Sequence, residues 1–261
     1  TPDSSTLFLK LPMATARMAG KYKLTEVGPA LQDVINKYYN TDMAGGATAA
    51  SRAKIDSTAK AKAKKAEPVK PAYSPQQFTF AIRAVKTPLL TKFVPDLKQL
   101  DPVNISGSFN SETGILLVNG AMPKAVYGTN EISNAKLNIN TNNNALNYNF
   151  TVDQIKVGSS INLLYTSISG SAQNNKLNIS LQVRDADKKE RYRLAGVFTA
   201  LPNEYQFSFL PNGLLLDYTP WTVNPNNSFQ FGGRGILAKD FSISNTNQVL
   251  SVSSSAPDYN S

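Results

Sequence analysis

The chain has 261 residues, with 27 lysines and arginines against 18 aspartates and glutamates, and it contains neither histidine nor cysteine. Without cysteine it can form no disulfide, thiolate nucleophile or zinc–thiolate site. Without histidine it can supply no Ser-His-Asp triad and no histidine metal site. The net charge of +9 raises the question of nucleic-acid binding.

The first region, residues 1–49, reads as two short strands followed by a helix. The strands are expected at Leu7–Leu11 and Gly20–Leu24, and the helix at about 27–39 with Pro29 in its first turn. The apolar side chains that share one face of this helix are Leu31, Val34, Ile35 and Tyr38. This stripe predicts packing of the helix against a sheet.

A basic segment, residues 50–75, holds most of the excess charge. Between Arg52 and Lys70 there are seven bases and two acids, a net charge of +5, in a stretch rich in alanine and lysine that has no apolar stripe. Such a composition is typical of a solvated, disordered linker, and the alternative is an arm that binds phosphate or anionic lipid. From Tyr73 onward there are 15 bases and 12 acids, so the charge predicts no nucleic-acid partner.

The third region, residues 76–261, is expected to be a β region with a short helix near 88–94. Thr87-Pro88 supplies an N-cap and a proline at the first helical position, and Pro95 ends the helix. Beyond Pro102 apolar and polar residues alternate with a period of two, typical of antiparallel strands with one wet face. Turns are expected at Asn142–Asn144, Gly158–Ser160, Asn174–Asn175, Asp185–Lys189, Leu201–Asn203 and Pro211–Gly213.

The tetrapeptide Lys136-Leu-Asn-Ile139 recurs as Lys176-Leu-Asn-Ile179, which fits a meander of similar strands. Strands with one apolar and one polar face need something to bury the apolar face. Closure into a barrel, a second stacked sheet, or a groove for an apolar ligand would each satisfy this need.

A search for catalytic or metal-binding motifs yields none, so the sequence predicts no enzyme, no metal and no cofactor. The acidic cluster from Asp185 to Glu190 is interleaved with lysines and lacks the EF-hand spacing, which favours a solvated hairpin turn. Gly232–Gly235 lacks the P-loop lysine and is expected to form a tight turn or bulge. Arg191 and Arg193 are expected on the wet face of a strand.

The last third of the chain carries a more specific pattern. It runs through Trp221-Thr-Val223, Asn226-Asn227, Phe229-x-Phe231, Phe241-x-Ile243 and Gln248 before Leu250 and Val252. This pattern resembles the TamB branch of the AsmA-like proteins, in the form found in Bacteroides-type bacteria. The segments Leu11–Arg17, Tyr38–Asn40 and Phe78–Ser108 are similar to the upstream part of the same proteins.

The resemblance implies a mainly β fold, an elongated antiparallel, meandering sheet curled into a gutter (a β-taco) with one or two short helices. It implies an internal piece of a longer periplasmic protein that is anchored in the inner membrane, outside this segment, and reaches toward the outer membrane. The expected function is non-enzymatic: an apolar groove for phospholipid transport in outer-membrane biogenesis. The expected partners are phospholipid acyl chains and a BamA- or TamA-like outer-membrane barrel protein.

The residues expected to line the groove are Leu137, Ile139, Leu146, Tyr148, Phe150, Leu177, Ile179, Leu181, Phe207 and Phe209. The opposing interpretation is that they fill a closed core. An alternative function is a scaffold or chaperone for outer-membrane β-barrel assembly or autotransporter secretion, acting through sheet-edge pairing. A glycan-binding β adhesin is a weaker alternative, because the chain has one tryptophan.

Overall fold

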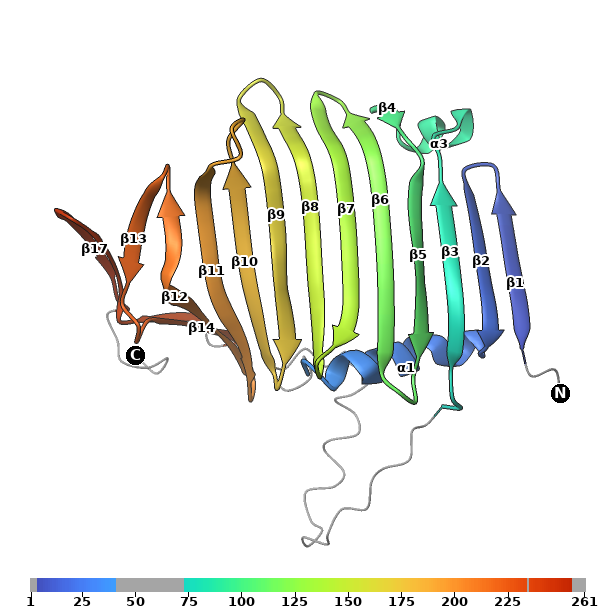
Figure 1. Cartoon of the computed structure of the whole chain (residues 1–261), viewed down its shortest axis with the longest axis horizontal. Coiled ribbons are helices and arrows are strands. Elements are labelled where there is room, and N and C mark those ends of the chain that lie inside the picture. Colours follow the sequence, from blue (N-terminus) through green and yellow to red (C-terminus); the bar gives the residue numbers. More distant parts are fainter. Residues whose placement is uncertain (1–3, 41–72, 234, 255–261) are drawn as a thin grey trace, which may run out of the picture.

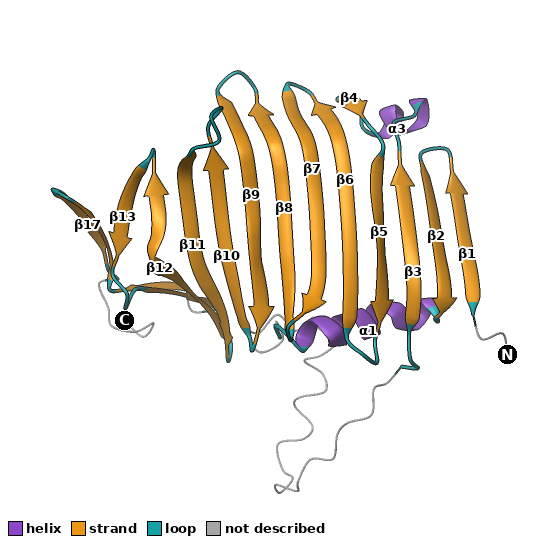
Figure 2. Cartoon of the chain, viewed as in Figure 1, coloured by secondary structure: helices purple, strands orange, loops and turns teal. Residues whose placement is uncertain are grey.

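The computed structural model describes residues 4–40, 73–233 and 235–254, and these form one large antiparallel sheet with two helices (Figures 1 and 2). The fold is therefore mainly β, as expected, and the sheet is open because it does not close into a barrel. The expected linker lies almost wholly outside the described residues.

The strands of the first half are β1 (Ser5–Leu11), β2 (Ala14–Lys21), β3 (Gln77–Ala84), β4 (Leu97–Leu100), β5 (Val103–Asn110), β6 (Ile115–Tyr127), β7 (Asn130–Asn142) and β8 (Ala145–Val157). Those of the second half are β9 (Ile161–Gln173), β10 (Lys176–Arg184), β11 (Glu190–Leu201), β12 (Glu204–Leu216), β13 (Thr219–Val223), β14 (Ser228–Gly232), β15 (Gly235–Lys239), β16 (Phe241–Asn245) and β17 (Gln248–Val252). The helices are α1 (Leu24–Asn36) and α3 (Pro88–Phe93).

Neighbouring strands follow chain order from β1 to β12, apart from β4, which pairs with the end of β6 beyond β5. Strand β2 pairs with β3 over its whole length, so the first region and the third region belong to one sheet (Figure 1). Asparagines with positive φ form the tight turns after β7 and β9, at Asn143–Asn144 and Asn174–Asn175, as the sequence predicts.

The predicted turn at Pro211–Gly213 is wrong, because the chain continues through it within β12. Phe209 pairs with Gly196 and Leu214 with Leu194, so a large bulge separates two halves of the strand. The first half pairs with β14 and the second with β13. Because a bulge bends the strand that carries it, the sheet divides here into two short branches.

Helix α1 begins three residues earlier than expected and ends at Asn36. The strand predicted at Gly20–Leu24 is wrong, because β2 spans Ala14–Lys21 and Leu24 begins the helix. The Lys23 backbone N–H donates to Gln76 Oε1 at 2.8 Å, and the Lys23 carbonyl accepts from Glu26 and Val27. Since Gln76 is distant in sequence, local signals cannot locate this helix start. Pro29 therefore lies in the second turn rather than the first.

Helix α3 matches its predicted position. The Thr87 side chain accepts a hydrogen bond from the Leu90 N–H at 3.2 Å, and Pro88 occupies the first helical position. The β14–β15 connection is the tight turn expected at the glycine-rich segment, with Gly232 paired to Gly235.

Candidate functional site

One face of the sheet carries three adjacent apolar rows that cross eleven strands, from β1 to β12. Residues that pair directly across neighbouring strands point to the same face, as do residues two apart along one strand. We name the rows by their distance from α1: lower, middle and upper. Together they form the apolar face.

The middle row is Leu7, Met18, Phe80, Gly107, Val118, Ile139, Tyr148, Gly170, Ile179, Gly196 and Phe209. The upper row is Leu9, Ala16, Ile82, Ile105, Gly120, Leu137, Phe150, Ile168, Leu181, Leu194 and Leu214. The lower row includes Gly20, Phe78, Phe109, then Leu146, Ala172, Leu177, Phe198 and Phe207, with Leu116 and Thr141 between the two groups.

The structure places all ten predicted groove residues on this face. Four lie in the middle row, three in the upper row and three in the lower row. Phe207 is buried and Phe209 packs into a C-terminal core, whereas the other eight are half-buried or, for Phe150, 37% exposed. From β7 to β10 the middle and upper rows are thus only half-buried, or exposed in the case of Phe150.

The sequence reading missed several members of the rows, among them Ile168 and Phe198. Ile168 lies in the serine-rich stretch of β9, where Ser167, Ser169 and Ser171 alternate with Ile168, Gly170 and Ala172. That alternation is a period-two signal and would have identified β9. The contribution of β1 to β6 to the same face depends on long-range strand pairing, which no local pattern reveals.

At one end of the sheet, α1 covers the lower row. Ala30 and Val34 are fully buried against Phe78, Phe109 and Leu116. In Figure 1 the helix runs behind the lower ends of the strands from β2 to β8. Apolar side chains spaced three to four apart on α1 and every second residue on the strands explain this packing.

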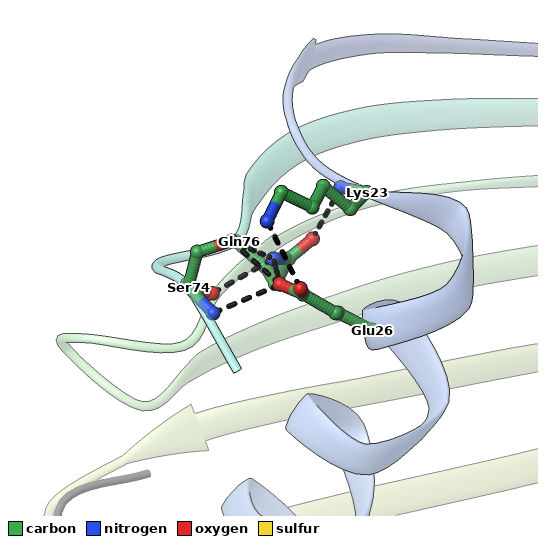
Figure 3. A network of polar contacts seen from close by, with 4 residues as sticks. All are labelled: Lys23, Glu26, Ser74 and Gln76. Carbon is green, nitrogen blue, oxygen red and sulfur yellow. Dashed lines mark hydrogen bonds and ion pairs between the residues drawn. The ribbon is translucent and has the colours of Figure 1, made fainter. Parts of the chain in front are cut away.

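A network of hydrogen bonds holds the N-terminal end of α1 against the segment that precedes β3 (Figure 3). The Glu26 carboxylate accepts from the Ser74 N–H at 2.8 Å, from the Ser74 hydroxyl at 2.6 Å and from Gln76 Nε2 at 3.2 Å, and it pairs with Lys23 Nζ at 3.1 Å. Gln76 is 1% exposed, and its backbone exchanges two hydrogen bonds with Ser111. The helix start is therefore joined to the segment preceding β3 and to the end of β5.

This network lowers the pKa of Glu26 to about 2, chiefly because the Ser74 hydroxyl and N–H donate to the carboxylate, with Lys23 adding a further hydrogen bond. The charged form is therefore the one that the fold stabilises. At the other end of the helix segment, the Tyr38 carbonyl accepts from the Asn175 N–H at 3.0 Å in the β9–β10 turn.

Between α1 and the sheet lies an apolar cavity of about 470 Å³, which we call the helix pocket. Its lining residues are Leu7, Ala16, Arg17, Met18, Val27, Leu31, Ile35, Phe78, Phe80, Ile82, Phe109, Leu116, Val118 and Ile139. Its lining residues include members of all three rows, and those of the lower row are buried.

Aromatic rings lie across glycines on the apolar face. The Tyr148 hydroxyl in β8 donates to the Asn178 carbonyl in β10 at 2.8 Å, so its ring spans β9 at Gly170. A Cβ atom at Gly170 would collide with both of these oxygens. The glycine thus permits an aromatic ring to lie along the sheet, which keeps this part of the face continuous.

At the other end, a C-terminal core closes the face. Leu214, Val223 and Ile243 are buried there, with Phe209, Trp221 and Phe241 packed around them. A chain of ring contacts connects this core to the lower row: Phe198–Phe207 at 4.7 Å, Phe207–Phe209 at 4.8 Å and Phe209–Phe241 at 5.5 Å between ring centroids. At the β12 end the rows therefore end in packed structure, whereas at the β1 end Leu7 and Leu9 are 41% and 49% exposed.

The opposite face is mainly polar, with Phe8 and Leu117 among its exposed apolar exceptions. Asn138 donates to Asn119 at 2.8 Å, Asn140 donates to Asn138 at 3.0 Å, and Asn178 donates to Ser171 at 3.3 Å. These polar side chains form hydrogen bonds with one another, so the two faces of the sheet differ in chemical character.

The remaining predicted features form ordinary surface structure. Asp185 lies in the β10–β11 turn and accepts from the Lys189 N–H at 2.9 Å and from the Tyr218 hydroxyl at 2.7 Å. Arg191 pairs with Asp217 at 2.7 Å. Among the described residues there is no group of three or more Asp or Glu side chains placed to hold a metal ion, and neither described helix has the length and apolar character to cross a membrane.

Comparisons of this chain with models of protein families, with curated proteins and with solved structures found no match.

Proposed function

We propose that the chain is a non-enzymatic periplasmic segment of a TamB- or AsmA-like protein, and that its apolar face carries phospholipid acyl chains between the inner and outer membranes. The partner at the outer membrane would be a BamA- or TamA-like barrel protein. The residue pattern of the last third supports the family assignment.

The observation that carries the proposal is the half-exposed apolar face, which α1 covers only along the lower row and the C-terminal core closes only at the β12 end. Soluble proteins rarely expose contiguous apolar surfaces of this kind unless the surface binds something. Acyl chains suit it because burial of each methylene contributes about 0.8 kcal/mol and requires no directional partner. The rows run from strand to strand, so a chain lying along them would meet apolar side chains throughout.

Lipid co-purification tests this function. The purified protein is extracted with organic solvent and the extract is analysed by mass spectrometry, with a polar-face variant such as Asn149→Ala as the control. We expect phospholipid in stoichiometric amounts from both. A triple variant with Leu137, Phe150 and Ile168 changed to glutamine should carry much less lipid. Lipid-free wild-type protein from a membrane-containing source would contradict the proposal.

A second function, strand-edge binding of β-barrel precursors, is favoured by β1. All seven residues of β1 are exposed, including Phe8 at 62% and Leu9 at 49%. Among the described residues β1 pairs only with β2, so its other edge has open backbone groups for an incoming strand. A photo-crosslinker at Phe8 that captures unfolded barrel protein would support this function, and capture only of lipid would exclude it.

A further inference from the structure

We propose that the helix pocket is a discrete binding site for a single fatty acyl chain, with α1 as its outer wall. This inference rests on the proposed function, and it goes further by distinguishing one enclosed site from the open part of the apolar face.

The first argument comes from the two apolar sides of α1. Ala30 and Val34 already make the contact with the sheet and are fully buried. Val27, Leu31 and Ile35 are spaced by four residues, lie on a neighbouring side of the helix, and line the pocket while remaining partly exposed. Val27 and Leu31 also touch the core beneath the helix, but like Ile35 they stay partly exposed, so the helix carries more apolar surface toward the sheet than its packing buries.

The second argument is the gradient of exposure inside the pocket. Ile82 in the upper row is 40% exposed and Leu7 in the middle row is 41% exposed, whereas Phe78 is 7% and Phe109 is 2% exposed. The pocket is thus accessible from the open face and closed at its base under α1. A linear apolar chain could enter from the open rows and bury its end against the phenylalanines.

The third argument concerns the class of ligand. Of the fourteen lining residues, thirteen are apolar and Arg17 alone is charged. The volume of about 470 Å³ lies within the range typical of small-molecule sites. A site without polar groups to fix orientation suits a saturated hydrocarbon tail and leaves the polar head of the lipid outside, toward solvent.

The repeated tetrapeptide provides a matched pair of test positions. Ile139 and Ile179 follow the same Lys-Leu-Asn sequence, lie in the same middle row and are both half-buried. Ile139 lines the helix pocket, and Ile179 lies on the open part of the face. Ile139→Trp should fill the pocket, and Ile179→Trp adds the same bulk outside it.

The experiment uses a long-chain fatty acid with a photoreactive diazirine at its terminal carbon, bound to the full chain, followed by peptide mapping. We expect saturable labelling of α1 around Leu31 and of β6 around Val118, with one probe per chain at this pocket. Ile139→Trp should reduce this labelling at least ten-fold, and Ile179→Trp should change it less than two-fold. Circular dichroism and the urea midpoint confirm that both variants are folded.

The outcomes separate this proposal from the proposed function. Labelling confined to β8–β11 and unaffected by Ile139→Trp would overturn the helix pocket as a site while leaving lipid binding by the open face in place. Absence of labelling anywhere would overturn both. If Ile139→Trp does not fold, the wild-type peptide map still decides, because labelling that omits α1 and β6 contradicts the proposal.

Discussion

Rows of the same apolar face differ in burial between two parts of the sheet. Under α1, the lower row is buried and packed, with Phe109 at 2% exposure, whereas in the centre of the sheet Phe150 of the upper row is 37% exposed. The residue types and their alternation are alike in both parts. The difference therefore comes from what covers the strands: apolar periodicity specifies a face, and a separate element decides whether that face becomes a core or a surface.

The largest expected effect contrasts the two phenylalanines. Phe109→Ala should reduce the free energy of unfolding by about 3–5 kcal/mol, because it leaves a cavity in the core beneath α1. Phe150→Ala should reduce it by about 1 kcal/mol, since that side chain is already partly in water. Urea denaturation measures both values. Equal losses would mean that the centre of the sheet is packed as tightly as the covered end.

Gly170 tests whether aromatic rings lie along the open part of the face. Gly170→Ala should destabilise the protein by about 1–3 kcal/mol, because the new methyl group would collide with the Tyr148 hydroxyl and the Asn178 carbonyl. Thermal denaturation measures the loss. Tyr148→Leu in the same chain should recover only part of the loss, because the Asn178 backbone carbonyl still obstructs the methyl group. An additive effect of the two changes would contradict a clash with the ring.

The pH dependence of stability tests the polar network that holds the N-terminal end of α1. The pKa of Glu26 lies at about 2 in the folded protein, below its ordinary value of 4.5. Its contribution to stability is therefore complete above pH 4.5 and is lost as the pH falls from about 4.5 to about 2. The stability difference between wild type and Glu26→Gln should be constant near neutral pH and should shrink across this window.

Other carboxylates titrate in both proteins and cancel in that difference. A difference that stays constant down to pH 2 would show that Glu26 is not held by the network with Ser74.

The smallest effect concerns α1 itself. Gly28 is exposed within the helix, and a Cβ atom there would meet no atom within 4 Å outside the local helix backbone and its chain neighbours, one of which is Pro29. Gly28→Ala should therefore stabilise the protein by about 0.5–1 kcal/mol, since glycine is a poor helix former. A rise in the urea midpoint measures it. A fall would indicate that α1 needs flexibility at this position to dock on the sheet.

The sequence was sufficient to predict most strands and which of their residues share the apolar face, because period-two alternation is a local signal. It placed ten residues on the apolar face, and the N-cap pair Thr87-Pro88 located α3. It was insufficient wherever a distant residue decides the outcome. The start of α1 depends on Gln76, and the expected turn at Pro211 became a bulge because the two halves of β12 pair with different strands.

The position of α1 over the lower row likewise could not be predicted from local sequence patterns. The apolar stripe on the helix predicted packing against a sheet, yet which rows it would cover, and the helix pocket it would leave, follow from strand pairing between residues far apart in the chain.

A single crosslinking measurement tests the central claim most directly. Phe150 and Asn149 are neighbours in β8 whose side chains point to opposite faces of the sheet, the apolar and the polar face. A benzophenone amino acid is placed at position 150 or at position 149, and the protein is irradiated with labelled phospholipid vesicles. We predict lipid adducts at position 150 and few or none at position 149. Equal labelling at both positions, or labelling only at position 149, would contradict the proposal that the apolar face carries lipid.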